Sequence, residues 1–277
     1  MVEARAVVII EDDVDIREVL ATVFGQGGFR VHTFASGAEG VKGVREYCPL
    51  VVILDVGLPD IDGYEVARQL RLFSNTYVLM LTARSQETDV LLGLEAGADD
   101  YVSKPFRPRE VRYRVEALLR RPRIRSDTVS LTDSPLEPET VATRGTAEAA
   151  GPATVTAHRS MQLYQHNGLR LNLRTRTAEV DGAEVRLTGS EFELLHTLLR
   201  TGRTVHAKED LALVLGRGNV GQNGFGRESD EQVVQVHIAN LRKKLGDSPA
   251  DPRWVETVHG FGYRLAASRD SPVAAEA

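Results

Sequence analysis

The first 121 residues of the sequence predict an α/β fold, and the residues after about 165 predict a smaller α+β domain. Short aliphatic runs alternate with stretches of helical periodicity in the first part, which is typical of a parallel sheet covered by helices on both faces. A long stretch rich in Pro, Thr, Ser, Ala and Gly follows, and it lacks the large apolar residues that a core needs. We therefore expect a doubly wound, five-stranded parallel sheet joined by a long linker to an α+β domain.

The strands and helices of the first domain are predicted in alternation. The aliphatic runs that predict strands are Ala6–Ile10, Val31–Phe34, Val51–Leu54, Val78–Leu81 and, more weakly, Tyr101–Val102. Helical periodicity covers Val14–Phe24, Ala38–Tyr47 and Tyr64–Leu72. Ser36 and Glu39 fit a capping box. The glycines of the run 25–28 precede a strand, so they are interpreted as a helix stop rather than a dinucleotide loop.

The chain after residue 121 divides into three segments. Residues 122–165 are interpreted as a flexible linker, 166–268 as a folded domain and 269–277 as a disordered tail. In the folded domain, Asp181-Gly182 indicates a β-hairpin. Helical patterns that precede a closing hairpin cover Ser190–Leu199, Lys208–Leu215 and Asp230–Leu245. The length of the linker favours two loosely coupled domains.

The composition excludes several classes of protein. One cysteine, Cys48, excludes a disulfide framework and a zinc site built from several thiolates. The N-terminus is too short and too charged for a secretory leader, and no apolar run approaches the roughly 20 residues of a membrane helix. The formal net charge is -5, and no segment is basic overall, so nucleic acid would have to bind a local patch. We expect a soluble, cytoplasmic protein with no membrane contact.

Polar residues follow the predicted strands at the points where those strands end. Glu11 and Asp12 follow the first strand, Asp55 the third and Thr82 the fourth, while the fifth leads into the sequence Ser-Lys-Pro at 103–105. The carboxyl ends of parallel strands meet at one edge of a sheet, where ligands bind. Three carboxylates in one place repel one another unless a cation joins them, and an all-oxygen set favours Mg²⁺. An aspartate beside Mg²⁺ and a lysine suits phosphoryl transfer.

The first 121 residues resemble the receiver domain of bacterial two-component response regulators. The motifs that carry the resemblance are IIEDD, LDVGLPDIDG, MLTAR and GADDYVSKPF, in this order and spacing. The resemblance implies a CheY-like, flavodoxin-like fold with Asp55 as the phospho-acceptor. It implies that Glu11, Asp12, Asp55 and the backbone carbonyl of Gly57 hold Mg²⁺.

The same resemblance implies a conformational switch. Thr82 contacts the phosphoryl group, and Lys104 pairs with it. Lys104-Pro105 is expected to be a cis peptide. Tyr101 is expected to swing inward as Thr82 moves toward the phosphate, which remodels the face formed by the fourth helix, fifth strand and fifth helix.

Residues from about 168 to 267 resemble the winged-helix effector domain of the OmpR/PhoB class. The motifs VVQVHIANLRKKLGDSP and WVETVHGFGYRL carry this resemblance. It implies that Asp230–Leu245 is a DNA-recognition helix and that Val258–Gly262 forms the tip of the wing. Val234, Ile238 and Leu241 recur at helical spacing and indicate the buried side of the helix.

The residues expected to contact DNA lie on the opposite side of that helix, on its flanks and in the wing. They are Gln232, Val233, Val236, His237, Asn240, Arg242, Lys243, His259 and Arg264. Arg253 is placed to help with phosphates. Relatives usually carry more arginine on this helix and often an arginine at the wing tip, where this chain has His259. We therefore expect modest affinity per monomer and reliance on dimers at direct or tandem half-sites in double-stranded promoter DNA.

A dimer face and further partners are also implied by the resemblance. The charged residues that match the receiver dimer of the family are Asp99, Asp100, Glu110, Arg114 and Arg121. The fourth helix reads VLLGL where relatives place a basic residue, which predicts a more apolar or weaker dimer. The glycine-rich loop 216–229 matches the surface that such proteins offer to RNA polymerase, although flexibility alone explains this composition as well.

These features predict a transcription factor rather than an enzyme: a response regulator that a sensor histidine kinase phosphorylates on Asp55 and that then dimerises and binds promoter DNA. A phosphatase of the haloacid dehalogenase type also uses an aspartate after a strand, but it needs a second aspartate where this chain has Gly57. The remaining alternative is a receiver-containing DNA-binding regulator that is controlled without phosphorylation.

Overall fold

The computed structural model describes residues 5–83, 87–120, 163–216 and 227–269. The predicted linker up to residue 162, the tail from residue 270, most of the loop 216–229 and Arg121 therefore lie outside the described residues.

The first domain contains the predicted parallel sheet. Its strands pair in the order β2-β1-β3-β4-β5, and every pair is parallel. The chain visits the strands on both sides of β1, so the sheet is doubly wound as expected. The strands are β1 (Ala6–Ile10), β2 (Arg30–Phe34), β3 (Val51–Asp55), β4 (Tyr77–Thr82) and β5 (Asp100–Ser103).

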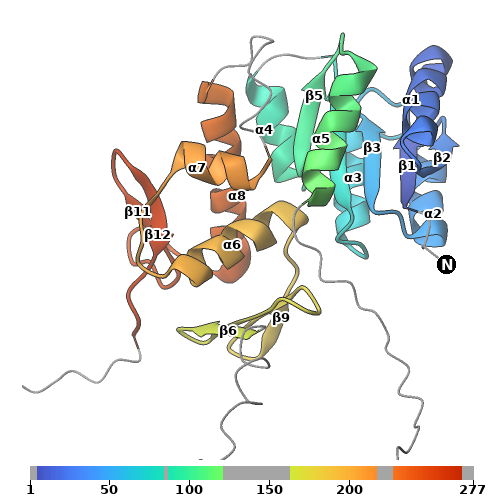
Figure 1. Ribbon diagram of the computed structural model, residues 1–277. Coiled ribbons are helices and arrows are strands. Elements are labelled where there is room, and N and C mark those ends of the chain that lie inside the picture. Colours follow the sequence, from blue (N-terminus) through green and yellow to red (C-terminus); the bar gives the residue numbers. More distant parts are fainter. Residues whose placement is uncertain (1–4, 84–86, 121–162, 217–226, 270–277) are drawn as a thin grey trace, which may run out of the picture.

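Helices cover both faces of this sheet (Figure 1). They are α1 (Val14–Gln26), α2 (Gly37–Tyr47), α3 (Gly63–Arg71), α4 (Glu87–Glu95) and α5 (Pro108–Arg120). Successive residues of a strand point to opposite faces, so Val7 and Ile9 pack with α1 and α5, whereas Val8 and Ile10 pack with α2, α3 and α4. This alternation explains why the central strands are aliphatic throughout.

Local signals set the ends of the helices. Ser36 is the N-cap of α2, and its hydroxyl accepts a hydrogen bond from the backbone N–H of Glu39 at 3.4 Å. Gly27 is the C-cap of α1, which confirms the interpretation of the glycine run as a helix stop. Gly40 lets α2 approach the sheet, since a Cβ there would lie 2.3 Å from a methyl group of Ile10.

The second domain combines two small antiparallel sheets with three helices. A four-stranded sheet contains β6 (Leu163–His166), β7 (Leu169–Asn172), β8 (Thr177–Val180) and β9 (Ala183–Val185). The helices are α6 (Gly189–Thr201), α7 (Lys208–Val214) and α8 (Arg227–Leu245). A three-stranded sheet contains β10 (His206–Ala207), β11 (Val255–Val258) and β12 (Gly262–Leu265).

The boundaries of this domain differ slightly from those expected. Residues 163–165, which were expected in the linker, pair with β7 as part of β6, because Leu163 and Gln165 alternate with half-buried neighbours in a strand pattern. Arg269, expected in the tail, donates its backbone N–H to Asn167 Oδ1 at 2.7 Å. The predicted hairpin at Asp181-Gly182 is present, with φ angles of 50° and 87°.

The two domains are packed against each other, so the expectation of loose coupling is wrong for this structure. Helix α8 lies beside α4 of the first domain (Figure 1). Asn240 on α8 donates a hydrogen bond to the backbone oxygen of Leu94 on α4 at 3.0 Å. The expectation was based on the length and composition of the linker. Neither property indicates whether the surfaces of the two folded domains are complementary.

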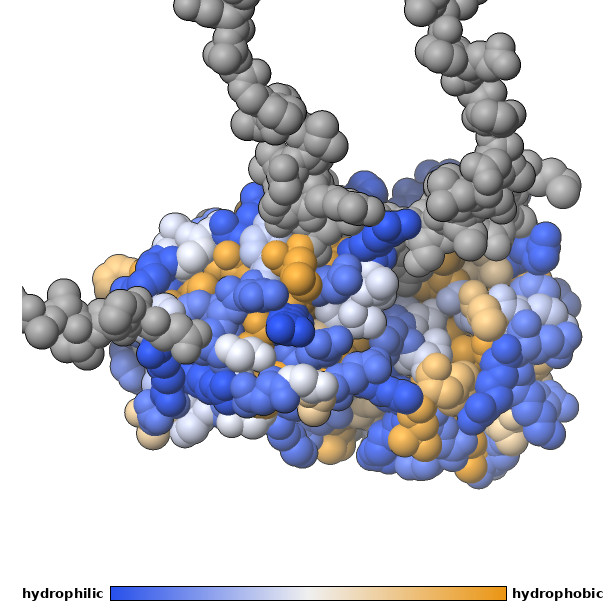
Figure 2. Space-filling model, turned by 90° about the horizontal axis from the view of Figure 1, so that it is seen from below, coloured by the Kyte–Doolittle hydropathy of each residue, from blue (hydrophilic) through white to orange (hydrophobic). Residues whose placement is uncertain are grey.

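Neither domain carries a membrane-spanning helix among the described residues, since none of the helices there combines the necessary length with an apolar sequence. On the face of the molecule shown in Figure 2, hydrophobic residues lie in separate groups among hydrophilic ones.

Gly63 provides a test of how closely α3 must pack beneath the loop after β3. A Cβ on Gly63 would lie 2.2 Å from the backbone oxygen of Asp55 and 2.8 Å from Val56 Cα. Because both are backbone atoms, we expect Gly63→Ala to lower the free energy of unfolding by about 1–3 kcal/mol in urea denaturation. The same change at Gly25, which has nothing within 4 Å, should be neutral or slightly stabilising. Equal stability of the two variants would contradict this account.

Candidate functional site

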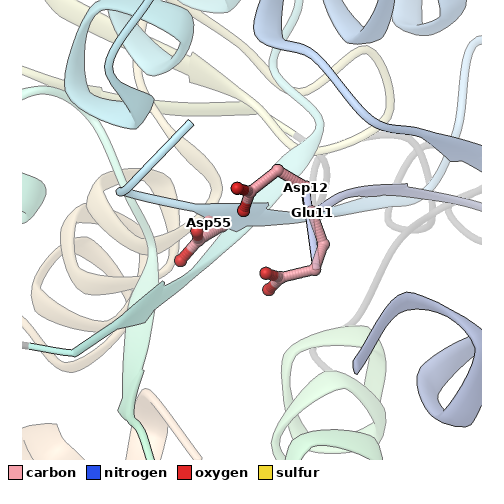
Figure 3. A group of neighbouring side chains, drawn as sticks. All are labelled: Glu11, Asp12 and Asp55. Carbon is pink, nitrogen blue, oxygen red and sulfur yellow. The ribbon is translucent and has the colours of Figure 1, made fainter. Parts of the chain in front are cut away.

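Three carboxylates meet at the carboxyl edge of the first sheet (Figure 3). Glu11 and Asp12 follow β1, and Asp55 is the last residue of β3. One oxygen of each lies within 4.8 Å of the others. Glu11 and Asp55 are buried and Asp12 is exposed, so the cluster opens to solvent on one side. An all-oxygen set that is partly open to water fits the coordination of Mg²⁺, which keeps several of its own waters.

Lys104 supplies the positive charge of the cluster. Its Nζ lies 2.9 Å from Asp55 Oδ1 and 2.8 Å from Glu11 Oε2. The chain holds Lys104 in place through its backbone N–H, which donates to the oxygen of Thr82 at 2.7 Å, and the Lys104-Pro105 peptide is cis as expected. The single positive charge of the lysine is therefore shared between Asp55 and Glu11.

Burial and ion pairing act on these groups in opposite directions. Burial raises the pKa of Glu11, the hydrogen bond from Lys104 opposes that shift, and the nearby charge of Asp55 adds to it. For Lys104, burial alone would lower the pKa, but the bonds to Glu11 and Asp55 outweigh it and the pKa is raised. The lysine is thus firmly protonated while it faces the two acids.

The other expected pocket residues surround this cluster. Thr82 ends β4, is 3% exposed and stands opposite Ser103 in the register of β4 with β5. Tyr101 is half-buried on β5, opposite Met80. Gly57 is close to Asp55, since a Cβ placed on it would lie 3.4 Å from Asp55 Oδ2. Asp55 and Thr82 therefore end their strands at the same edge of the sheet, whereas Tyr101 lies two residues before the end of β5.

The second domain presents α8 and the β11–β12 hairpin as its candidate DNA interface. On α8, Gln235, Ala239, Lys243 and Lys244 are exposed, and Gln232, Val236 and Asn240 are partly exposed. In the hairpin, His259 is exposed at the tip, as expected. Phe261 beside it is 72% exposed, which gives the wing tip an aromatic character that sequence reasoning did not single out.

Three residues expected at the DNA interface are buried instead. Val233 is 0% and His237 is 1% exposed. Arg242 donates from Nη2 to the backbone oxygen of Val255 at 2.7 Å and to Thr257 Oγ1 at 2.8 Å, so it ties α8 to the wing sheet. Helical spacing places these residues at the edge of the buried stripe of α8. Whether a residue at that edge is buried or exposed depends on which elements pack beside the helix. In this conformation none of the three is available to DNA.

Two arginines expected near phosphates are also engaged within the domain. Arg264 pairs with Glu256, and this bond holds the pKa of Glu256 below its usual value. Arg253 forms a bidentate pair with Asp181, with distances of 2.7 and 2.8 Å. Both arginines brace the domain, and either would have to exchange a carboxylate for a phosphate to contact DNA.

Comparison with known proteins assigns both domains. Residues 7–116 match the family described as response regulator receiver domain, and residues 182–265 match that described as transcriptional regulatory protein, C terminal. The chain is 33% identical over 266 residues to the probable transcriptional regulator ycf27 of Cyanophora paradoxa, covering 95% of this chain and 96% of that protein. It is 33% identical over 260 residues to the DNA-binding response regulator MtrA of Mycolicibacterium smegmatis, covering 94% and 96%.

This chain belongs to the OmpR/PhoB family of two-component response regulators. It is a transcription factor of a family that is not enzymatic, as expected. Its receiver implies a kinase partner, its effector domain implies binding to DNA, and its acidic cluster is the typical Mg²⁺ site of receivers. Among solved structures, a RitR mutant covers 96% of this chain over its own full length with a TM-score of 0.68 and 18% identity, which shows a shared fold.

Four of the five charged residues expected at the receiver dimer face lie among the described residues, and these four are paired within this response regulator. Arg114 bonds Asp100 at 3.2 Å and Glu110 at 3.4 Å. Asp99 is 1% exposed and bonds Arg71 of its own domain and Ser190 of the other. The face is thus covered in part by the effector domain.

Sequence reasoning missed Arg17 as a member of the pocket. Its Nη1 donates to the backbone oxygens of Glu11 and Asp12, at 2.6 and 2.9 Å, and so fixes the loop that carries both acids. Asp13 supports the same loop as the N-cap of α1. The one signal in the sequence that could have revealed this role is a cation one turn into the helix after the acidic motif.

Lys104→Gln tests the charge balance of the pocket. Removing the ammonium leaves Glu11 and Asp55 uncompensated, so we expect a loss of roughly 3 kcal/mol in unfolding free energy without metal. We also expect a larger rise in Tm on adding Mg²⁺ than in the wild type, because the metal replaces the missing charge. Lys42→Gln, at an exposed site on α2, is the charge-matched control. A smaller Mg²⁺-induced rise in Lys104→Gln than in the control would contradict this balance.

Proposed function

We propose that this response regulator is a cytoplasmic transcription factor that a sensor histidine kinase phosphorylates on Asp55, and that the phosphorylated form dimerises and binds promoter DNA. The observation that carries the proposal is the position of Asp55, beside Lys104 and next to two further acids at the carboxyl edge of the sheet. An aspartate that only shaped a turn after the strand would not need a lysine and two further carboxylates beside it.

The transfer step follows from this geometry. One carboxylate oxygen of Asp55 attacks the phosphorus of the donor phosphohistidine, the P–N bond breaks, and an acyl phosphate forms on the aspartate. The ammonium of Lys104, already 2.9 Å from Asp55 Oδ1, offsets the added negative charge. A Mg²⁺ held by Glu11, Asp12, Asp55 and the carbonyl of Gly57 would offset the rest.

The phosphoryl group then biases the receiver toward a second conformation. It carries about two negative charges, where the free carboxylate carried one, and three acceptor oxygens, which favour an inward position of Thr82. Tyr101 follows, because β4 and β5 are paired and Tyr101 lies near Thr82 in their register. The shift remodels α4, β5 and α5, the face through which we propose that two receivers pair.

DNA binding is proposed for the exposed side of α8 and for the wing. Gln232, Val236 and Asn240 are the residues proposed to read base edges, Lys243 to contact phosphate, and His259 to reach the groove from the wing. The scarcity of free cations on this surface favours a dimer on repeated half-sites. RNA polymerase remains a proposed partner of the loop 216–229, most of which lies outside the described residues.

Mass spectrometry of the intact protein tests the acceptor. Wild-type protein incubated with a small phosphodonor and Mg²⁺ should gain one phosphoryl group, and Asp55→Asn should gain none. Asp15→Asn, which removes an exposed carboxylate at the start of α1, should behave as the wild type. Absence of an adduct in the wild type would favour the alternative, a DNA-binding regulator controlled without phosphorylation.

Lys243→Ala tests the DNA face. A phosphate contact adds affinity regardless of sequence, so we expect binding to promoter and unrelated DNA to weaken by a similar factor. The slope of log K against log salt should fall by about 1. Lys42→Ala, on the receiver, should leave both quantities unchanged. An unaltered salt slope in Lys243→Ala would exclude this lysine from the interface.

A further inference from the structure

The loop that follows Asp55, residues 56–62, connects β3 to α3 and carries Gly57. We call it the β3–α3 loop. The main chain closes its two ends, since the backbone N–H of Gly63 donates to the oxygen of Val56 at 3.0 Å. This bond does not involve the middle of the loop. Gly57 is exposed, so the direction of its carbonyl depends on how the rest of the loop is held.

Asp60 ties the middle of this loop to the start of α2. Its Oδ1 accepts a hydrogen bond from the backbone N–H of Gly37 at 2.8 Å, and its Oδ2 accepts one from the backbone N–H of Ala38 at 2.9 Å. These are the first two residues of α2, where backbone N–H groups have no partner within the helix. The bonds, that from Ala38 foremost, hold the pKa of Asp60 below its usual value. Both carboxylate oxygens are therefore fixed on the helix.

Gly37 lets the loop come close enough for these bonds. A Cβ on Gly37 would lie 2.6 Å from Cγ1 of Ile61. A side chain there would push Ile61, and with it the adjacent Asp60, away from the helix. Ser36 caps the same helix end from within its own segment, through its side chain. The start of α2 therefore has two caps, one local and one supplied by the β3–α3 loop.

The start of α2 is also connected to the acidic cluster. The strand before it is β2, and the oxygen of its last residue, Phe34, accepts a hydrogen bond from the backbone N–H of Glu11 at 3.1 Å. Only residues 35 and 36 separate Phe34 from α2. Asp60 therefore links the loop that carries Gly57 to the segment that is bonded to Glu11.

We propose that Asp60 is a positioning residue of the magnesium site, which fixes the β3–α3 loop so that the carbonyl of Gly57 faces the acidic cluster. The inference rests on the proposed function, in which Gly57 supplies one ligand of Mg²⁺. This ion demands near-ideal octahedral geometry, so a ligand held in a variable direction costs affinity even when the carboxylates stay in place. Asp60 acts through the loop and is not itself a ligand, because both of its oxygens are bonded to α2.

Three substitutions test the proposal by isothermal titration calorimetry of the full-length protein with Mg²⁺. Asp60→Ala removes both bonds to α2. Ser36→Ala removes the local cap of the same helix end and leaves the loop unchanged, so it controls for destabilisation of α2. Glu39→Gln removes an exposed negative charge from the first turn of α2, so it controls for the loss of a charge near the cation.

Asp60→Ala should raise the Kd for Mg²⁺ about 5-fold, which corresponds to about 1 kcal/mol, the usual stabilisation by a helix cap. Both controls should bind Mg²⁺ as tightly as the wild type, although Ser36→Ala should lower Tm about as much as Asp60→Ala does. Asp60→Asn keeps one acceptor oxygen and should show a smaller rise in Kd. At saturating Mg²⁺, Asp60→Ala should accept as much phosphate from a small phosphodonor as the wild type does.

The salt dependence separates the effect of position from that of charge. Ions at about 0.5 M NaCl screen the loss of an exposed charge, whereas a change in the direction of a ligand persists there. An unchanged Kd in Asp60→Ala, a rise that disappears at high salt, or an equal rise in Ser36→Ala overturns the positioning role. In each of these cases a phosphoryl adduct on the wild type leaves the proposed function standing. A wild type that binds no Mg²⁺ overturns this inference together with the proposed magnesium site.

Discussion

Three carboxylates within 4.8 Å of one another are a constraint that the rest of the receiver has to satisfy. In water such a cluster would disperse, but Glu11 and Asp55 are fixed by strands that are buried on both faces. A cation has to offset their charges, and Lys104, which follows β5 on the far side of β4, provides it. The pocket forms only when β1, β3, β4 and β5 are in register. The strand pairing that builds the core therefore also brings the acidic cluster and Lys104 together.

Strand β4 connects this pocket with the contact between the two domains. Thr82 at its carboxyl end lies beside the acidic cluster, and Tyr77 at its amino end lies against the effector domain, roughly 17 Å away for five residues of extended chain. Asp99 and Lys104 stand in the same relation at the two ends of β5. A shift of β4 or β5 would therefore move residues at the acidic cluster and at the domain contact together. The acidic cluster and the interdomain contact thus lie at opposite ends of the same two strands.

Much of the fold was predictable because it rests on local patterns. The run Ala6–Ile10 is aliphatic over its whole length since both faces of the sheet are covered, and Asp181-Gly182 specifies a hairpin through its backbone geometry. The pocket was predictable because parallel strands place their carboxyl ends together. Arg17 was missed because its role depends on a loop shape that no periodicity records.

The domain contact was not predictable from any of these patterns. Gly189 looks like a helix start, and only Tyr77, more than one hundred residues earlier in the chain, explains why a side chain is excluded there. The burial of His237 has the same origin, since its Nε2 lies 3.3 Å from the backbone oxygen of Asp99 in the receiver. Surface complementarity between two folded domains arises after folding, and a sequence read segment by segment does not contain it.

The covalent connection between α5 and β6 changes how strong the domain contact has to be. Two surfaces on one chain meet at an effective concentration in the millimolar range, so a contact that would hold separate proteins only weakly, about 4 kcal/mol, keeps about half of the molecules closed. The contact consists of the hydrogen bonds of Ser190 with Asp99 and of Asn240 with Leu94, together with the apolar cluster that the two domains share. A change of about 1.4 kcal/mol in their combined strength changes the ratio of closed to open molecules tenfold.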